Sequence, residues 1–317
     1  MDEREGARSD TNVVGMPTRL VWEKVPVDGK PATFGRGGSG DPVVFLHGWA
    51  IGAAAYRSAL RELIRRGKTV IAPALPGFGG TADLAPGERS LAGYAGWVAR
   101  FLDALGLSDR ALVMGHSFGG GVAIALAHDH PERVSGLVLV NSIGGSAWAK
   151  TKSTVRSMAE RPIWEWGIHF TADLLPVRNV RRVLPVVISE SVPNLLRSPG
   201  SFLKVADVAR KADLSAELEE LKARGLPVVV LWGNRDRIIT RASVDAICDA
   251  LGDNGALVVA GGHAWILADP RGFGEVMTNV VDVVLRAKAL SARPQTPEDE
   301  LSRRQEGRFT KGQAEAG

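Results

Sequence analysis

The chain has 317 residues, of which 45% are hydrophobic, and it carries a formal net charge of +4. This length and composition support a large buried core, which excludes a disordered or fibrous protein. The net charge is small for the length, and no basic run is interleaved with aromatic residues, so nucleic acid is not expected as a partner.

Membrane insertion and secretion are not expected either. The most apolar stretches, such as Pro227 to Trp232, have strand length and fall short of the roughly 20 residues that cross a bilayer. The first ten residues contain acids and lack an apolar core, so they do not resemble a secretory signal, and a cytoplasmic location is expected. The single cysteine, Cys248, has no partner for a disulfide or a metal site, and we expect no metal or other cofactor.

Short apolar runs alternate with helix-length segments along most of the chain. Two pieces with alternating polar and apolar residues, around Leu20–Val25 and Ala32–Arg36, predict an antiparallel edge. Six further strands are predicted at Pro42–Leu46, Thr69–Ala72, Ala111–Met114, Val134–Val140, Pro227–Trp232 and Ala256–Val259. Continuous apolar strands separated by amphipathic helices favour an α/β fold with a mostly parallel, doubly wound sheet.

The alternation breaks after Asn141, and the next clear strand begins at Pro227. Apolar residues in between recur at helical spacing. Four prolines are expected to divide this stretch into short helices: Pro162, Pro176, Pro185 and Pro193. We therefore predict an inserted helical cap over residues 142–224.

The remaining parts of the chain follow from this insertion. Residues 19–141 and 225–289 are predicted to form the α/β core on either side of the cap. Residues 1–18 and 290–317 are rich in charge and poor in apolar side chains, so they cannot offset the entropy cost of ordering. Both ends are predicted to be flexible tails.

A G-x-S-x-G pattern surrounds Ser117, between a buried strand and a helix-like segment. The sharp turn from strand to helix strains its central residue, and side chains two positions to either side would clash, which explains Gly115 and Gly119. This turn lifts the hydroxyl clear of the sheet, and the helix N-terminus behind it favours a developing oxyanion. Ser117 is the predicted nucleophile.

A serine hydroxyl is a poor nucleophile unless a base takes its proton. His263 lies in a glycine-rich loop directly after a late apolar strand, so it is the predicted base. His116 is next to the nucleophile in sequence and is expected to point away from it. His128 and His130 suit a helix end or solvent.

The base in turn needs an acid that fixes its tautomer and stabilises the imidazolium. Asp236 follows the strand at Pro227–Trp232, at the end of a parallel strand where active sites form in open α/β sheets. Asn141, after the preceding strand, occupies another place where such an acid could sit, but an amide carries no charge. Asp236 is therefore the predicted acid.

Acyl transfer also needs two N–H donors for the tetrahedral oxygen. The turn at the nucleophile supplies the backbone N–H of Phe118. The loop after Pro42–Leu46 supplies that of Trp49, because Gly48 lets the backbone come close. His47 is then predicted to hold this loop and not to act as a second base.

Five motifs, HGW, LPGFGG, GHSFGG, GNRD and GGHAW, occur in this order. Together they resemble the α/β-hydrolase family in its cap-bearing branch, and the likeness runs from about Leu20 to Leu285. In that family the corresponding residues act as nucleophile, acid, base and oxyanion donors. The resemblance thus implies these same roles for Ser117, Asp236, His263, Trp49 and Phe118. It does not define the substrate.

Several activities of cap-bearing relatives fit this sequence poorly. Epoxide hydrolases and haloalkane dehalogenases need a carboxylate nucleophile, whereas Ser117 would give a stable ether. Epoxide opening also uses tyrosines from the cap, and the two tyrosines here, Tyr56 and Tyr94, both precede it. A peptidase of the proline iminopeptidase type would carry tryptophan after its nucleophile, where this chain has Phe118.

The favoured function is hydrolysis of a carboxylic ester through an acyl-enzyme, in the EC 3.1.1 class. The substrate would be a small molecule whose apolar part lies under the cap, against some of Trp148, Trp164, Trp166, Ile168 and Phe170. His169 could face the same pocket.

Other bonds stay open on the same residues, among them thioesters, amides and C–C bonds. A C–C hydrolase needs a site for a substrate carboxylate, which the cluster Arg178, Arg181 and Arg182 could supply, although surface solubility also explains this cluster. A ligand-binding receptor without turnover on the same fold is the alternative of another class. Oligomeric state is not defined by the sequence.

Overall fold

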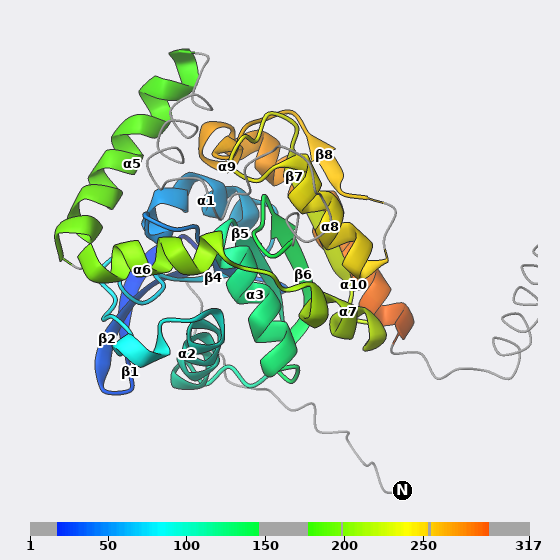
Figure 1. Ribbon diagram of the computed structural model, residues 1–317, viewed down its shortest axis with the longest axis horizontal. Coiled ribbons are helices and arrows are strands. Elements are labelled where there is room, and N and C mark those ends of the chain that lie inside the picture. Colours follow the sequence, from blue (N-terminus) through cyan, green and yellow to red (C-terminus); the bar gives the residue numbers. More distant parts are fainter. Residues whose placement is uncertain (1–17, 146–176, 198, 253–254, 292–317) are drawn as a thin grey trace, which may run out of the picture.

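The computed structural model describes residues 18–145, 177–197, 199–252 and 255–291. Within them lies one eight-stranded sheet (Figure 1). Its strands are β1 (Val21–Val27), β2 (Lys30–Gly37), β3 (Pro42–Leu46), β4 (Thr69–Pro73), β5 (Ala111–His116), β6 (Val134–Val140), β7 (Val228–Gly233) and β8 (Leu257–Val259). The strand order is β1-β2-β4-β3-β5-β6-β7-β8. β2 pairs antiparallel with both β1 and β4, and the ladders from β4 to β8 are all parallel.

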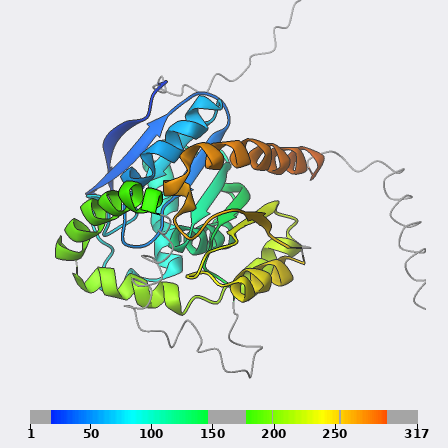
Figure 2. The same ribbon diagram turned by 90° about the horizontal axis from the view of Figure 1, so that it is seen from above.

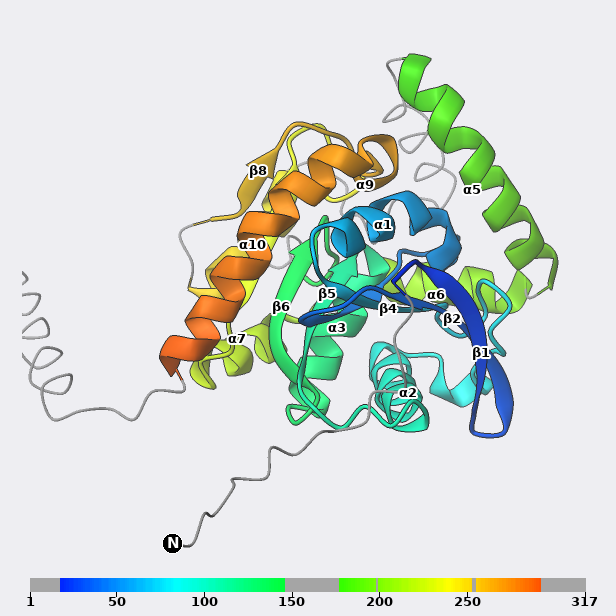
Figure 3. The same ribbon diagram turned by 180° about the vertical axis from the view of Figure 1, so that it is seen from behind.

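Helices cover both faces of this sheet. Those on one face are α2 (Leu91–Ala104), α3 (Phe118–Asp129) and α8 (Arg241–Leu251). The opposite face is covered by α1 (Arg57–Arg65) and α10 (Pro270–Ser291), which lie in front of the sheet in Figure 3. Three short helices complete the core: η1 (Ala53–Tyr56), η2 (Pro86–Glu88) and α9 (Trp265–Ala268).

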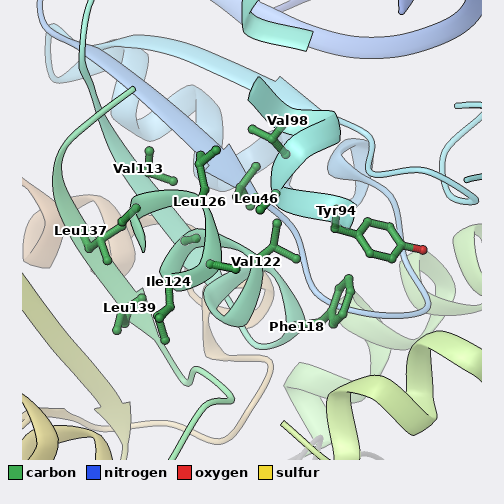
Figure 4. Close-up of a cluster of buried hydrophobic side chains, with 14 of the residues drawn as sticks. Leu46, Tyr94, Val98, Val113, Phe118, Val122, Ile124, Leu126, Leu137 and Leu139 are labelled. Atoms are coloured by element: carbon green, nitrogen blue, oxygen red, sulfur yellow. The ribbon is translucent and has the colours of Figure 1, made fainter. Parts of the chain in front are cut away.

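Two apolar clusters fill the space between the sheet and these helices. Successive strand side chains point to opposite faces, so Leu112 and Met114 of β5 join one cluster and Val113 joins the other. Figure 4 shows the second cluster, where Val113 and other strand residues lie against Val122, Ile124 and Leu126 of α3. Burying each such side chain contributes roughly 2 kcal/mol, so the strand ends that carry the site are held on a rigid frame.

The predicted parallel, doubly wound sheet is confirmed. Each predicted strand is present, with ends displaced by two residues or fewer, and the two N-terminal pieces form the antiparallel edge that the alternation of residues indicated. Cys248 is buried in the core. No helix within the described parts of the chain is long and apolar enough to span a membrane.

A helical insertion separates β6 from β7. It contains α5 (Val177–Arg197), α6 (Pro199–Arg210) and α7 (Ser215–Ala223). Figure 2 shows α5 and α6 next to each other at one end of the molecule, and the two helices are in contact. Residues 146–176 of the predicted cap lie outside the described residues, as do 1–17 and 292–317 of the predicted tails, while α10 continues to Ser291.

One prediction about the insertion is wrong. Pro185 and Pro193 do not divide it into short helices, because both lie inside the single helix α5. A proline in a helix interior costs about 3 kcal/mol, since it removes a backbone donor and its ring clashes with the preceding turn. Tertiary packing offsets this cost: Val183 is fully buried, Asn194 is 3% exposed, and α5 contacts both η1 and α9. The other two prolines of that prediction lie outside the described residues.

Candidate active site

Ser117 occupies the turn between β5 and α3 in a strained backbone conformation. Its φ is +54° and its ψ is −117°, a sparsely populated combination that costs a residue with a side chain roughly 1–3 kcal/mol. The turn leaves no room for side chains at the neighbouring glycines. A Cβ at Gly115 would overlap the carbonyl of Gly119, and one at Gly119 would overlap the carbonyl of Leu46. The glycines of the motif are therefore required by sterics.

His263 and Asp236 form a hydrogen-bonded pair beyond the ends of β8 and β7. Nδ1 of His263 lies 2.8 Å from Oδ2 of Asp236, and their side chains are 8% and 0% exposed. A carboxylate only accepts hydrogen bonds, so Nδ1–H is the donor and the lone pair of the imidazole lies on Nε2.

Four donors converge on the carboxylate of Asp236. Its Oδ1 accepts from the backbone N–H groups of Ile238 at 2.8 Å and Ile239 at 2.9 Å. Its Oδ2 accepts from Nδ2 of Asn141 at 2.5 Å, besides the imidazole of His263. Asn141 follows β6, the neighbour of β7, and the sequence marked it only as a place that lacks an acid. In the structure it supports the acid of the adjacent loop.

A cavity of about 200 Å³ joins the two sides of the site. Ser117 and His263 both line it, together with Trp49 and Phe118. Much of the remaining wall is apolar and comes from the core and from the helical insertion: Ala50, Ile51, Val187, Phe202, Ile238 and Leu267. Among the described residues that line it there is no Lys, Arg, Asp or Glu. The predicted cap residues Trp148, Trp164, Trp166, Ile168, His169 and Phe170 lie outside the described residues.

The imidazole of His47 holds the loop that follows β3, as predicted. The backbone N–H of Leu75 donates to its Nε2 at 2.8 Å, so its Nδ1–H donates to the carbonyl of Gly48, also at 2.8 Å. Because the Gly48–Trp49 peptide is trans, its carbonyl and its N–H point in opposite directions, and the bond to His47 restrains both from the core side. Burial lowers the pKa of His47 to about 4, which keeps this imidazole neutral at pH 7.

His116, which was expected to point away from the nucleophile, borders the site. It lines the same cavity, and its ring centroid is 4.9 Å from that of His263. Its Nε2 donates to the backbone carbonyl of His263 at 3.0 Å, so its Nδ1 accepts from the hydroxyl of Tyr56 at 2.8 Å. Burial, with a smaller effect of the nearby His263, lowers the pKa of His116 to about 3. The side chain points this way because it ends β5 on the same face as Met114.

Tyr56 extends this contact to the loop after β3. The backbone N–H of Gly48 donates to its hydroxyl oxygen at 3.2 Å. Burial raises the pKa of Tyr56, so the hydroxyl stays protonated and can donate to His116 while accepting from Gly48. Tyr56 and His116 thereby connect the loop of Trp49 to the loop of His263. Sequence analysis gave Tyr56 no such role.

His128 and His130, the other histidines that the structure describes, do not line the cavity. His128 lies near the end of α3 beside Asp129 and Glu220, which raise its pKa. His130 lies 3.7 Å from Glu132. Both placements agree with the predicted helix end. Within the described ranges, no group of three or more His, Cys, Asp or Glu side chains could hold a metal ion.

The arrangement of a strained serine, a buried acid–imidazole pair and a sheet of this topology agrees with comparison to known proteins. Residues 41–168 match the family model described as the alpha/beta hydrolase fold. Together with the sheet topology, this match shows that the chain has the α/β-hydrolase fold. The site lies beyond the carboxyl ends of β3, β5, β7 and β8, near the point where the strand order reverses.

Individual relatives differ in their named activities. The chain is 29% identical over 242 residues to a putative non-heme haloperoxidase of Mycobacterium phage D29, covering 74% of this chain and 84% of that protein. It is 39% identical over 132 residues to 2-hydroxymuconate semialdehyde hydrolase of Pseudomonas putida, covering 37% of this chain and 44% of that protein. The bromoperoxidase structure from Bacillus anthracis matches 83% of this chain and 100% of that chain, with a TM-score of 0.66 and 18% identity. At this identity the structural likeness shows the fold alone.

Proposed function

We propose that the chain is a serine hydrolase that cleaves carboxylic esters through an acyl-enzyme. Ser117 is the nucleophile, His263 the base and Asp236 the orienting acid. The observation that carries this proposal is the 2.8 Å hydrogen bond between Nδ1 of His263 and Asp236. This bond makes Nδ1 the donor and leaves Nε2 as the basic nitrogen, on an imidazole that lines the same cavity as Ser117. The hydrogen-bonded acid stabilises the imidazolium that forms when the serine loses its proton.

Hydrogen bonding distinguishes His263 from the other two histidines of the site. The acceptor nitrogen of His47 is occupied by the backbone N–H of Leu75, and that of His116 by the hydroxyl of Tyr56. Neither imidazole has a lone pair left for the proton of Ser117. Their lowered pKa values, about 4 and about 3, act in the same direction. His263 has its donor nitrogen on an acid, so its other nitrogen is the base.

The reaction then follows in two steps. Oγ of Ser117 attacks the ester carbonyl carbon as its proton passes to Nε2 of His263. The backbone N–H groups of Trp49 and Phe118 bind the tetrahedral oxygen. That of Phe118 is suited to this because Phe118 begins α3, and the first N–H groups of a helix have no partner within it. His263 returns the proton to the departing alcohol, and a water molecule activated by the same imidazole hydrolyses the acyl-enzyme.

The cavity supports a neutral, apolar acyl group. Its described wall is largely apolar, and the volume of about 200 Å³ suits a small organic molecule. A charged acyl group would lose its hydration there without a partner among the described residues. We therefore propose small esters with an apolar acyl chain as the substrate class.

Cleavage of a C–C bond is the second candidate, favoured by the match to 2-hydroxymuconate semialdehyde hydrolase over 132 residues. Such a substrate carries a carboxylate, for which the sequence offered an arginine cluster on α5. Arg181 is exposed and does not line the cavity, and the side chains of Arg178 and Arg182 are not described. The apolar wall therefore favours the ester.

A series of p-nitrophenyl esters from acetate to palmitate, assayed with wild type and Ser117→Ala, tests the proposal. We expect a rate maximum at one chain length and a loss on the order of 10⁶ in kcat for Ser117→Ala, which should fold normally. Activity near wild type in a folded Ser117→Ala would show that another group is the nucleophile.

Labelling with a fluorophosphonate separates the remaining classes. A hydrolase of either bond type should be labelled at Ser117, whereas a receptor without turnover should not react. A protein that is labelled but hydrolyses no ester in the series contradicts ester cleavage and directs the next assay to C–C bonds. Absence of labelling in a folded sample contradicts the enzyme proposal itself.

A further inference from the structure

The side chain of Asn194, on α5 of the helical insertion, reaches two loops of the core. Its Oδ1 accepts from the backbone N–H of Gly79 at 3.2 Å, and its Nδ2 donates to the carbonyl of Ala50 at 3.0 Å. Asn194 is 3% exposed, whereas the next residues of the same helix, Leu195 and Leu196, are 41% and 76% exposed. A buried amide that uses both ends on backbone groups sets the distance and orientation of the segments it joins.

The contact with Ala50 falls at a strained residue. Ala50 has a φ of +74°, and this left-handed conformation costs a residue with a side chain roughly 1–2 kcal/mol. Without an outside contact, the loop would gain free energy by relaxing toward a negative φ. The hydrogen bond from Asn194 to the carbonyl of Ala50 opposes that relaxation, because the carbonyl turns with the backbone of Ala50.

Ala50 directly follows Trp49, whose N–H is the proposed oxyanion donor. On the core side, His47 restrains the peptide between Gly48 and Trp49 by one hydrogen bond to its carbonyl. On the other side, the peptide after Ala50 is fixed by Asn194. The indole of Trp49 is also bound, because its Nε1 donates to the carbonyl of Phe202 in α6 at 2.8 Å. The loop is thus held between the core and two helices of the insertion.

We propose that Asn194 is a positioning residue for the oxyanion loop. Through the carbonyl of Ala50 it keeps the N–H of Trp49 directed at the place where the tetrahedral oxygen forms. The seating of the inserted helices on the core thereby determines how well this donor is aligned. This inference rests on the proposed function, since it uses the assignment of Trp49 as an oxyanion donor.

The expected signature is a loss in kcat with little change in KM. The oxyanion exists only in the transition state, so misalignment of its donor removes stabilisation that the bound ester does not use. Complete removal of one such donor lowers kcat by about 10²–10³, and a displaced donor should lower it by about tenfold or more. A purely structural loss would instead lower the melting temperature or raise KM.

Four variants test the proposal by kinetics with the best p-nitrophenyl ester. Asn194→Ala removes both hydrogen bonds, and Asn194→Asp keeps the acceptor for Gly79 but loses the donor to Ala50. Ser189→Ala is the matched control on the same helix, because Ser189 is exposed and its hydroxyl donates to the carbonyl of Val186 within that helix. Ala50→Gly, alone and combined with Asn194→Ala, removes the strain that the proposal says Asn194 opposes.

The proposal predicts that both Asn194 variants lose about tenfold or more in kcat with KM within about twofold, while Ser189→Ala matches wild type. It also predicts that Ala50→Gly raises kcat by a larger factor in the Asn194→Ala background than in wild type. An unchanged kcat in folded Asn194→Asp overturns it. Equal effects of Ala50→Gly in the two backgrounds overturn it as well.

Hydrogen–deuterium exchange gives a readout that does not depend on turnover. The amides from Trp49 to Ile51 should exchange faster in Asn194→Ala, or in Asn194→Asp if the first variant does not fold, than in Ser189→Ala. Unchanged exchange of these amides overturns the proposal even if no ester is hydrolysed. If the wild type reacts with neither esters nor fluorophosphonate while the Asn194 variants still show the faster exchange, the proposed function is contradicted instead.

Discussion

Exchanging the acid and the amide at the site tests the proposed role of Asp236. Oδ2 of Asp236 accepts hydrogen bonds from Nδ2 of Asn141 at 2.5 Å and from Nδ1 of His263 at 2.8 Å. The side chain at position 141 and the imidazole therefore lie next to each other. The perturbation is Asp236→Asn, alone and combined with Asn141→Asp. The double variant moves the carboxylate from the loop after β7 to the loop after β6.

The single variant places donors against donors. With its amide nitrogen where Oδ2 was, Asp236→Asn faces the N–H of His263 and the amide of Asn141. With the amide turned over, it faces the backbone N–H groups of Ile238 and Ile239. The first orientation keeps the two backbone donors satisfied and is therefore preferred. It favours the wrong tautomer of His263, for which a loss of about 10⁴ in kcat is expected, equal to about 5.5 kcal/mol.

The double variant restores the balance of donors and acceptors. A carboxylate at position 141 still accepts from the backbone N–H of Gly233 and from Nε1 of Trp265, which bond Asn141 at 3.2 Å each in the wild type. Its second oxygen accepts from the new amide at position 236 and, after a small shift of the ring, from His263. We expect this to recover roughly 10- to 100-fold of the lost kcat, or about 1.4–2.7 kcal/mol.

The assay measures kcat for the best ester with the single variants Asp236→Asn and Asn141→Asp and with the double variant. Asn141→Asp alone puts two carboxylates at one site, where one must hold a proton, so its kcat should fall below wild type. The reasoning is refuted if folded Asp236→Asn keeps a kcat near wild type. It is equally refuted if the double variant is no more active than Asp236→Asn at matched folding, since the shared oxygen then does not orient the base.

Three further predictions concern the frame around the site. Gly119→Ala forces a Cβ onto the backbone at Leu46 and should lower the free energy of unfolding by about 1–3 kcal/mol and remove most activity. Gly200→Ala, where a Cβ meets open space on α6, is the control and should be neutral or stabilising. Urea melts of the two variants measure the difference. His47 and His116 have pKa values lowered to about 4 and about 3 in the folded protein. At a pH between these values and 6.5, each imidazole is therefore neutral when folded and takes up a proton when the protein unfolds. The free energy of unfolding should therefore fall as pH drops below 6.5, by up to about 2.7 kcal/mol per pH unit, and a pH-independent stability from pH 7 to pH 4.5 would contradict this. Tyr56→Phe leaves a buried backbone donor and the Nδ1 of His116 without a partner, and should lower stability by about 1–3 kcal/mol per group in thermal melts, with kcat reduced and the label at the serine retained.

Sequence patterns were sufficient for the sheet and for the elements that carry the chemistry. Continuous apolar runs such as Val134–Val140 mark strands buried on both faces, and the structure has the same bounds. The glycines around Ser117 are required because a Cβ at either position would overlap the backbone. Such a local steric requirement is visible in the sequence itself. The positions of Asp236 and His263 follow from the rule that parallel strands end at one edge of the sheet.

Contacts between loops distant in sequence could not be predicted in this way. Asn194 lies 144 residues from Ala50 and its pattern fits an ordinary helix position, so only the packing of α5 on the core reveals its partners. Asn141 could have been recognised, since it follows the strand next to the one that precedes Asp236. The prediction that Pro185 ends a helix was wrong because it weighed the low helix propensity of proline above the burial of Val183 and its neighbours, which keeps α5 continuous.

The loops of the site are held together beyond the point where strand pairing stops. Each of five strand ends contributes one buried polar side chain that bonds another segment: His47, His116, Asn141, Asp236 and His263. Some backbone hydrogen bonds also join these loops, such as that from the N–H of Arg235 to the carbonyl of Gly261 at 2.8 Å, and the side-chain hydrogen bonds add to this cross-strand connection. The same bonds therefore stabilise the fold and hold in place the groups to which we assign the proposed reaction. This dual role explains why two of the three histidines must stay neutral, because a second proton on either would break a bond that holds a loop of the site.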